Sequence, residues 1–258
     1  MKTKSLGFIG GGRITKIMLQ VIANNKTEYK AIVVYDINSE ILTALKSQFP
    51  GIQVASSVFD AAQQDMVFLA LHPPVIMDTL ELIKDQVKQG AVVISLAPKI
   101  TIQKIASKLK NVKNIVRLIP NATSIINEGY NPVCFFTEMS DWKKQTMLRL
   151  FRRMGHTFEV PEDKLESYAI MSAMLPTYFW FQWKELINLG NQIGLTEDES
   201  RNSVRDTMLA ALRTYFYSGL QPDEVIDLIP VKPIGEHEVQ INAIYNDKLL
   251  QLFAKIKP

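Results

Sequence analysis

Short apolar runs alternate with stretches of helical apolar spacing through the first 160 residues, and this alternation limits the possible folds more than any other feature. The runs that predict strands are residues 6–10, 31–35, 52–55, 66–71, 91–96 and 115–118. The stretches between them that predict helices are residues 14–23, 39–49, 75–87 and 102–109. Strands that alternate with helices in this way predict an α/β domain, in which helices cover both faces of a mostly parallel sheet.

The character of the chain changes after Pro161, where the strand-like runs end. A last strand pair is predicted before it, at residues 133–136 and 157–160, around a helix over 141–154. The helical patterns that follow cover residues 164–193, 197–218, 222–228 and 236–256. Pro176 interrupts the first of these patterns, so a kink or break is expected there. We therefore predict an α/β domain over residues 1–160 and an all-α domain over residues 161–258.

One stretch of the second half is aromatic on every side of its predicted helix. Residues 178–183 read Tyr-Phe-Trp-Phe-Gln-Trp. A helix that is apolar all round has to be buried on all sides, which a small helical domain cannot easily achieve alone. We expect a partner subunit to cover part of this surface; burial against the first domain and the neighbouring helices is the alternative.

Charge, hydropathy and cysteine content exclude several classes of protein. The chain has 29 basic and 26 acidic residues, and a net charge of +3 is too small to argue for a nucleic-acid partner. No apolar run reaches the roughly 18 residues of a membrane helix, and no signal-peptide pattern precedes the first predicted strand. Cys134 is the single cysteine, and the three histidines have no metal-ligand spacing. We expect a cytoplasmic protein that binds no metal, membrane or nucleic acid.

Three consecutive glycines, Gly10, Gly11 and Gly12, follow the first predicted strand and open a helix with Arg13 and Ile14. Gly10 and Gly12 match the first two glycines of the dinucleotide fingerprint G-x-G-x-x-G/A, whose third small position falls here on Thr15. The first glycine permits a tight turn, and the second lets the backbone approach a pyrophosphate at the helix N-terminus. The context of strand, turn and helix therefore predicts a dinucleotide site.

Asp36 ends the second predicted strand, 24 residues after Gly12. A carboxylate at this position accepts hydrogen bonds from the ribose hydroxyls of the adenosine and repels a 2′-phosphate. We therefore expect NAD(H) to be preferred, with NADP(H) possible because Arg13 could meet the phosphate. The alternative for Asp36 is a turn residue or a helix N-cap.

Four segments, taken together, resemble the pyrroline-5-carboxylate reductase family. Residues 6–14, LGFIGGGRI, are similar to that family's GFIGAGNMA, and residues 68–74, FLALHPP, to its strand ending in Lys-Pro-Gln. Residues 94–101, ISLAPKIT, stand where the family has SIAAGVT. Residues 117–123, RLIPNAT, are similar to its RVMPNTP, and Glu128-Gly129 follow as in the family.

The resemblance implies a Rossmann domain over residues 1–160 and a helical dimerisation and substrate domain over residues 161–258. It implies hydride transfer from NAD(P)H to a cyclic imine, pyrroline-5-carboxylate, which yields proline, and a homodimer or larger homo-oligomer. It also implies cofactor contacts from residues 71–73 (Leu71, His72 and Pro73) and from Asn121. His72 is equally consistent with a solvent-facing turn before two prolines.

The departures from the family lie in the substrate-binding half. The family's SGSGPAY is here SAMLPTY at residues 172–178, and its TSPGGTT is here VKPIGEH at residues 231–237. The candidate catalytic residues are Ser172, Lys232, Glu236 and His237. Two like charges about 4 Å apart near a surface repel by about 4 kcal/mol, so Glu236 would oppose a substrate carboxylate. Lys232 could offset this, Glu236 could cap the last helix, or a cationic substrate could receive a proton through Glu236 or His237.

These departures leave two alternatives open. The chain could reduce a different imine or carbonyl substrate, or it could be a dinucleotide-binding sensor that has lost catalysis. A coenzyme F420-linked reductase has the same type of Rossmann domain, but the long helical second half argues against it.

Overall fold

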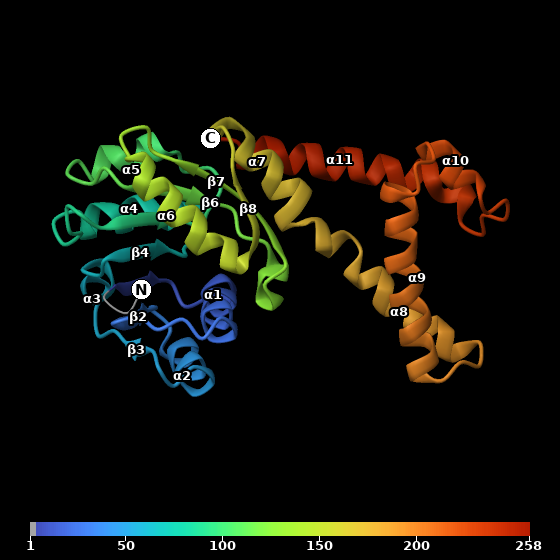
Figure 1. Cartoon of the computed structure of the whole chain (residues 1–258), viewed down its shortest axis with the longest axis horizontal. Coiled ribbons are helices and arrows are strands. Elements are labelled where there is room, and N and C mark those ends of the chain that lie inside the picture. The colour runs from blue at the N-terminus through green and yellow to red at the C-terminus, as the bar shows by residue number, and fades with distance from the viewer. Residues whose placement is uncertain (1–3) are drawn as a thin grey trace. The chain divides into compact units, whose positions relative to one another are not determined.

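The computed structural model describes residues 4–258, which form two compact units (Figure 1). Unit 1 holds the described residues up to Met174 together with Phe253–Pro258, and unit 2 is Leu175–Leu252. The sequence places the division at residue 160, at the end of the last predicted strand. In the structure the chain stays in the core of unit 1 beyond that point, because Leu165 and Ala169 are buried there. Among residues 4–258, no helix is both long and apolar enough to cross a membrane.

Unit 1 is built on one sheet of eight strands. They are β1 (Ser5–Ile9), β2 (Ala31–Tyr35), β3 (Gln53–Val54), β4 (Met66–Leu69), β5 (Val92–Ser95), β6 (Ile115–Leu118), β7 (Gly129–Phe135) and β8 (Gly155–Glu159). The strand order is β3-β2-β1-β4-β5-β6-β7-β8, and only the β6–β7 pair is antiparallel. The mostly parallel sheet predicted from the sequence is confirmed.

Helices cover both faces of this sheet (Figure 1). They are α1 (Arg13–Asn24), α2 (Ser39–Gln48), α3 (Val58–Ala62), α4 (Pro73–Ile83), α5 (Ile102–Lys108), α6 (Asp141–Phe151) and α7 (Leu165–Tyr168). Successive side chains of a strand point to opposite faces, so Phe8 lies in one core and its neighbour Ile9 in the other. The core of Phe8 contains α1, α2 and α6, and the core of Ile9 contains α3, α4, α5 and α7.

The long helical pattern predicted over residues 164–193 is broken into short segments. They are η3 (Glu162–Lys164), α7, the π-helix η4 (Ala169–Ala173), the 3₁₀-helix η5 (Leu175–Tyr178) and α8 (Trp180–Gln192). The break expected at Pro176 is confirmed, because proline has no N–H to donate and its ring clashes with the preceding turn.

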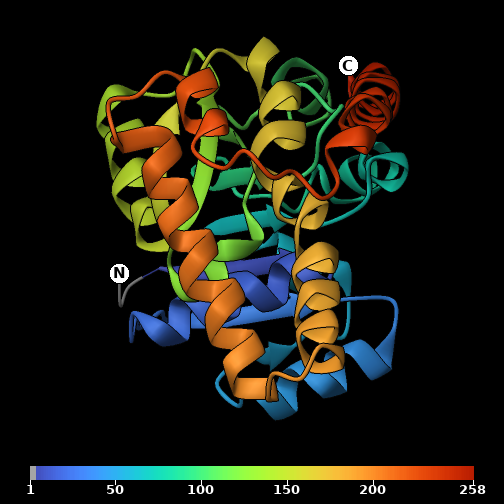
Figure 2. The same ribbon diagram turned by 90° about the vertical axis from the view of Figure 1, so that its right-hand side faces the viewer.

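Unit 2 consists of helices, as Figure 2 shows. After α8 come α9 (Glu197–Tyr217), α10 (Pro222–Asp227), the 3₁₀-helix η6 (Gly235–His237) and α11 (Glu238–Ile256), whose last residues belong to unit 1. The helix stop and N-cap predicted before α9 are confirmed: Gly194 has a φ of +103°, and Glu199 accepts the N–H of Thr196 at 2.8 Å. The sequence-based expectation of an all-α second part therefore holds.

The aromatic stretch at the start of α8 is not buried on all sides within the single chain. Trp180 is 45% and Phe181 66% exposed. Other large apolar side chains of unit 2 are equally open, among them Leu209, Leu212, Phe216, Val239, Ile244 and Leu250. Exposed apolar patches of this extent mark interaction surfaces in soluble proteins.

Candidate active site

The carboxyl ends of β1, β2 and β4 meet at one edge of the sheet. The strand order reverses there, since β2 and β3 lie on one side of β1 and β4, β5 and β6 on the other. In open parallel sheets, ligands bind at this switch point. We call this part of unit 1 the switch-point edge.

Gly10 makes the tight turn at the end of β1. Its φ is +103°, a conformation that favours glycine, and its N–H donates to the carbonyl oxygen of Tyr35 at 2.8 Å. A Cβ at this position would lie 2.3 Å from the carbonyl oxygen of Ala70, which is an impossible contact. The fold therefore requires a glycine here, because the turn after β1 lies directly against Ala70, the residue that follows β4.

Gly12 is a glycine for a different reason. Its φ of −69° suits any residue, and a Cβ there would meet no protein atom within 4 Å. It is the N-cap residue of α1 and supplies no side chain to cap the first-turn N–H groups. The protein does not need a glycine at this point, but a ligand that must approach the helix N-terminus closely would.

The first turn of α1 favours an anion. It contains no acidic residue, its Arg13 side chain is exposed, and Ile14 is half-buried. Thr15 occupies the third small position of the fingerprint and is completely buried; its hydroxyl donates to the carbonyl oxygen of Gly10 at 2.6 Å. The larger side chain is thus accommodated by a hydrogen bond to the turn itself.

Asp36 lies beside the glycine turn, as its spacing predicts. Its Oδ2 accepts the N–H of Gly11 at 2.7 Å, and its Oδ1 accepts the N–H of Asn38 at 2.8 Å. The carboxylate is half-buried, and each of its oxygens has further acceptor capacity. The structure therefore joins two roles, a turn residue that locks Gly11 in place and an acceptor at the edge where a ribose would lie.

Residues Leu71, His72 and Pro73 follow β4 at the same edge. The side chain of Leu71 lies next to Gly10, 3.3 Å from the position of a Cβ on that glycine. His72 is the exposed N-cap residue of α4 and its side chain makes no capping hydrogen bond; Pro73 occupies the first turn of that helix.

Asn121 comes three residues after β6 and is buried, with 6% of its surface exposed. Its Nδ2 donates to the carbonyl oxygen of Ser172 at 2.7 Å, and its Oδ1 accepts the N–H of Thr123 at 2.9 Å. The amide is thus engaged at both ends within the protein. Ser172 is also buried, and its hydroxyl donates to the carbonyl oxygen of Tyr168 at 2.8 Å.

The other three candidate catalytic residues, Lys232, Glu236 and His237, lie in unit 2 and are exposed. Glu236 Oε1 lies 3.5 Å from His237 Nε2, and His237 Nδ1 lies 3.3 Å from Gln240 Oε1. Both side chains are hydrated, with 81% of the Glu236 side chain and 54% of the His237 side chain exposed. The structure thus places the glycine turn, Asp36 and His72 together in unit 1, and the altered loop in unit 2.

Two features of unit 1 were not identified from the sequence, the exposed Ile37 and the buried Arg117. Ile37 follows Asp36 and is 92% exposed, so an apolar side chain stands open beside this carboxylate. An exposed isoleucine after a strand has no distinguishing pattern in one sequence.

Arg117 is the second such feature. It is completely buried in β6, with its Nη1 2.9 Å from Glu162 Oε1 and its Nη2 2.5 Å from Glu166 Oε1. Burial lowers the pKa of this guanidinium, but hydrogen bonds and charges from Glu166 and Glu162 outweigh burial and hold the pKa above its usual value. Glu162 and Glu166 also accept the N–H groups of Ile102 and Lys99, so the cluster ties α5 and α7 to the sheet.

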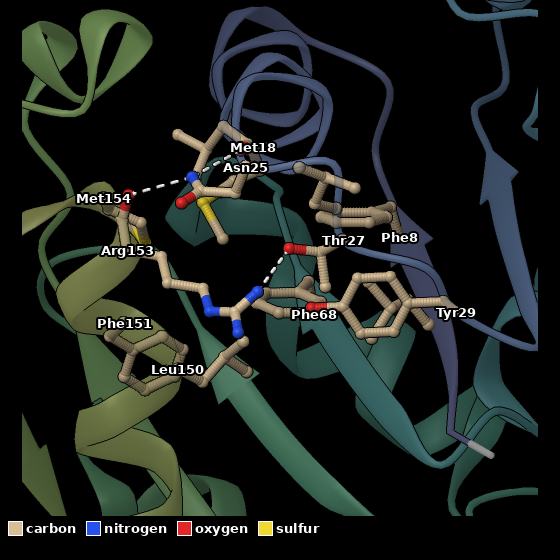
Figure 3. Close-up of a pocket in the computed structure, with 13 residues that line it drawn as sticks. Phe8, Met18, Asn25, Thr27, Tyr29, Phe68, Leu150, Phe151, Arg153 and Met154 are labelled. Atoms are coloured by element: carbon tan, nitrogen blue, oxygen red, sulfur yellow. Dashed lines mark hydrogen bonds between the residues drawn. The ribbon is translucent and has the colours of Figure 1, made fainter. Parts of the chain in front are cut away.

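A small pocket of about 30 Å³ is lined by residues from the second half of α1 and the end of α6 (Figure 3). Its lining is almost wholly apolar and includes Phe8, Phe68 and Phe151, and Arg153 lies across it with its Nη1 2.5 Å from the hydroxyl of Thr27. Burial raises the pKa of Tyr29, another lining residue, to about 12. A cavity this small holds one water at most, so it belongs to the core and is no substrate site.

Comparison with known proteins agrees with this geometry. A family model described as NADP oxidoreductase coenzyme F420-dependent matches residues 5–99, the part that contains the glycine turn and Asp36. Pyrroline-5-carboxylate reductase 1 of Bacillus subtilis strain 168 is 25% identical over 244 residues, which cover 93% of this chain and 82% of the relative. The chain is therefore similar to pyrroline-5-carboxylate reductases along nearly its whole length. The family resemblance of residues 6–14, 68–74 and 117–123 is thereby confirmed.

Solved structures show that the fold is shared along the whole chain. The 1-pyrroline-5-carboxylate reductase of Streptococcus pyogenes superposes with a TM-score of 0.80 at 20% identity, covering 100% of this chain and 99% of the other. The pyrroline carboxylate reductase of Plasmodium falciparum, solved with NADP bound, gives a TM-score of 0.76 at 22% identity, covering 99% and 95%. The family model above ends at residue 99, so it covers the glycine turn and Asp36 and no part of unit 2.

Proposed function

We propose that this protein is a member of the pyrroline-5-carboxylate reductase family, an NAD(P)H-dependent reductase that acts on the C=N bond of pyrroline-5-carboxylate and forms proline. The observation that carries the proposal is the glycine turn. Gly12 leaves open space over the N-terminus of α1 that protein packing does not require, and Asp36 stands beside it. Relatives named pyrroline-5-carboxylate reductase match most of the length of the chain.

The residues of the switch-point edge have separate tasks in this proposal. The first-turn N–H groups of α1 bind the pyrophosphate, and Asp36 accepts hydrogen bonds from the adenosine ribose. When bound, the reduced nicotinamide supplies the hydride. An iminium carbon is already electrophilic, so placing the ring beside the nicotinamide supplies most of the catalysis and little acid–base chemistry is required.

We infer that NADH is the preferred cofactor. Asp36 keeps a negative charge where NADP carries its 2′-phosphate, and like charges about 4 Å apart cost about 4 kcal/mol near a surface. Arg13 is exposed at the start of α1 and would favour the phosphate, so NADPH remains a weaker second cofactor.

We further propose that unit 2 forms the interface of a homodimer or larger homo-oligomer, and that the enzyme works in the cytoplasm. The support for the oligomer is the exposed apolar surface of α8, α9 and α11. The support for the location is the sequence-based expectation, together with a single, buried cysteine.

The altered loop of unit 2 favours one alternative substrate. Glu236 and His237 replace the hydroxyls that the resemblance leads one to expect, and both are exposed and hydrated. If the protein does not reduce pyrroline-5-carboxylate, the alternative substrate is a cationic cyclic imine. Glu236 would attract a cationic substrate, whereas it would repel the carboxylate of pyrroline-5-carboxylate.

The test uses purified full-length protein with NADH or NADPH, followed by the ultraviolet absorbance of the reduced nicotinamide. We expect saturable oxidation with pyrroline-5-carboxylate, faster with NADH. Oxidation of the reduced nicotinamide with a cationic imine only would show that this imine, and not pyrroline-5-carboxylate, is the substrate. Calorimetric NADH binding without turnover of any imine would favour the sensor and overturn the proposed reaction.

A further inference from the structure

The backbone carbonyl of Ser172 cannot be satisfied in the ordinary helical way. In an uninterrupted α-helix this oxygen would accept the N–H of residue 176, four positions later. Residue 176 is proline and has no N–H. The side chain of Asn121 donates to this carbonyl instead, at 2.7 Å, with both residues almost completely buried.

The turn that contains Ser172 is irregular. Ala169–Ala173 is a π-helix, with the N–H of Met174 donating to the carbonyl oxygen of Ala169 at 3.0 Å. Single π-turns are rare and are found mostly at functional sites. This one ends at Met174, where unit 1 ends. This bond spans five positions and departs from the α-helical pattern, so a side chain from another element can determine the position of the turn.

Asn121 is itself held in place by hydrogen bonds within unit 1. The backbone N–H of Asn121 donates to Asn131 Oδ1 at 2.8 Å, and its Oδ1 caps η1 (Ala122–Ile126) through Thr123. Asn24, the last residue of α1, donates to the carbonyl oxygen of Ile125 in η1 at 3.0 Å. Direct contacts therefore lead from α1, through η1 and Asn121, to Ser172.

We propose that Asn121 is a positioning residue, whose amide replaces the donor that Pro176 lacks and holds the turn Ala169–Met174 against the end of β6. The inference rests on the proposed function for its catalytic consequence, since residues 172–178 correspond to a substrate segment of the family. In this role Asn121 touches neither cofactor nor substrate with its side chain. It determines where the turn lies once the cofactor is bound.

The variant Asn121→Asp replaces the donor by an acidic oxygen, while the other carboxylate oxygen still accepts from Thr123. The matched control is Asn127→Asp, which makes the same chemical change at the end of η1 and removes a 2.7 Å hydrogen bond from Asn127 Nδ2 to the carbonyl oxygen of Arg153. Three readouts on the full chain are compared: amide hydrogen exchange of residues 169–174, NADH affinity by calorimetry, and kcat and KM with the cyclic imine.

For Asn121→Asp we expect exchange in residues 169–174 to rise about tenfold or more, since a lost buried hydrogen bond changes local opening by that order. We expect kcat to fall by a similar factor while the NADH Kd changes less than about twofold. The control should leave the exchange of residues 169–174 and kcat near their wild-type values. Unchanged exchange in Asn121→Asp, or an equal loss of kcat in the control, would overturn the proposal.

A second variant tests the part of Pro176. Pro176→Ala restores a backbone N–H, so in combination with Asn121→Asp it should recover part of the lost protection. A double variant no better than Asn121→Asp alone would contradict the link between the two residues. If the wild-type protein reduced no imine, the proposed function would fail, and the exchange and NADH measurements would still decide the role of Asn121.

Discussion

At the scale of single residues, Gly10 and Gly12 belong to the same turn but differ in what surrounds them. Gly10 is required by the fold, because its φ is positive and a Cβ would collide with the backbone at Ala70. Gly12 has an ordinary φ and open space around it. The sequence alone treats the two glycines alike, and the structure shows that the fold requires only the first, while the second has open space around it.

We therefore predict that Gly12→Val abolishes NADH binding and leaves the protein folded. The free energy of unfolding should change by only about 1 kcal/mol, the cost of a poorer N-cap residue. Gly10→Ala should instead destabilise the protein by several kcal/mol. Calorimetric titration and chemical unfolding of both variants check this. Tight NADH binding by Gly12→Val would contradict the assignment of the helix N-terminus to the pyrophosphate.

Asp36 is the residue that should select the cofactor. Asp36→Ser removes a charge-assisted acceptor worth about 1.5–3 kcal/mol, so NADH binding should weaken about tenfold to a hundredfold. The repulsion of the 2′-phosphate disappears as well, and the preference should shift toward NADPH. The measurement is the ratio of kcat/KM values for the two cofactors, with Asp60→Ser, an exposed helix-capping carboxylate, as the control. An unchanged ratio in Asp36→Ser would contradict cofactor selection by this carboxylate.

At the scale of elements, the buried cluster of Arg117, Glu162 and Glu166 holds α5 and α7 on the sheet. Arg117→Leu would leave Glu166 buried without its cation, and breaking a buried ion pair costs about 3–5 kcal/mol. We predict this loss in urea unfolding. The exposed pair Lys113–Glu138 is the control, and Lys113→Leu should cost less than about 1 kcal/mol. Equal losses in the two variants would contradict a structural role for the buried cluster.

Elements with strong local patterns were predictable from the sequence, and those that depend on distant partners were not. β2 has the predicted bounds, because strands of a parallel sheet are near-continuous apolar runs, and β6 has them although Arg117 interrupts its apolar run. The short helix α3 was not predicted, because five residues contain too little periodicity to identify a helix. The segment η4 lies inside the helical pattern predicted over residues 164–193, but its π geometry was not predicted. The burial of Arg117 depends on two carboxylates that follow it by 45 and 49 residues, so no local pattern indicates it.

The same distinction holds for the candidate site. The glycine turn and Asp36 belong to a local motif with fixed spacing, and the structure brings them within hydrogen-bond distance. The bond from Asn121 to Ser172 joins residues 51 positions apart and depends on a missing N–H at Pro176. Single-sequence reasoning could identify these residue types by resemblance, but it could not show that the Asn121 amide is engaged on both sides.

At the scale of the whole molecule, the exposed apolar surface of unit 2 is of the kind that marks an interaction surface. We predict a dimer or a larger even assembly in light scattering. Phe216 is 66% exposed in the single chain, and Phe216→Glu should dissociate the assembly. In a symmetric interface the substitution occurs on both subunits, and each buried phenylalanine contributes about 2 kcal/mol. Trp142→Glu, 71% exposed on α6 of unit 1, is the matched control and should leave the assembly intact. A monomeric wild-type protein would contradict the prediction.

The most direct test of the central claim follows the hydride itself. The protein is incubated with pyrroline-5-carboxylate and NADH deuterated at the transferred position of the nicotinamide, and the product is analysed by mass spectrometry. We predict proline that carries one deuterium on the former imine carbon, formed by the wild-type protein and not by Gly12→Val. Proline without deuterium, or no proline while NADH binds, would contradict a reductase that transfers a hydride to this imine.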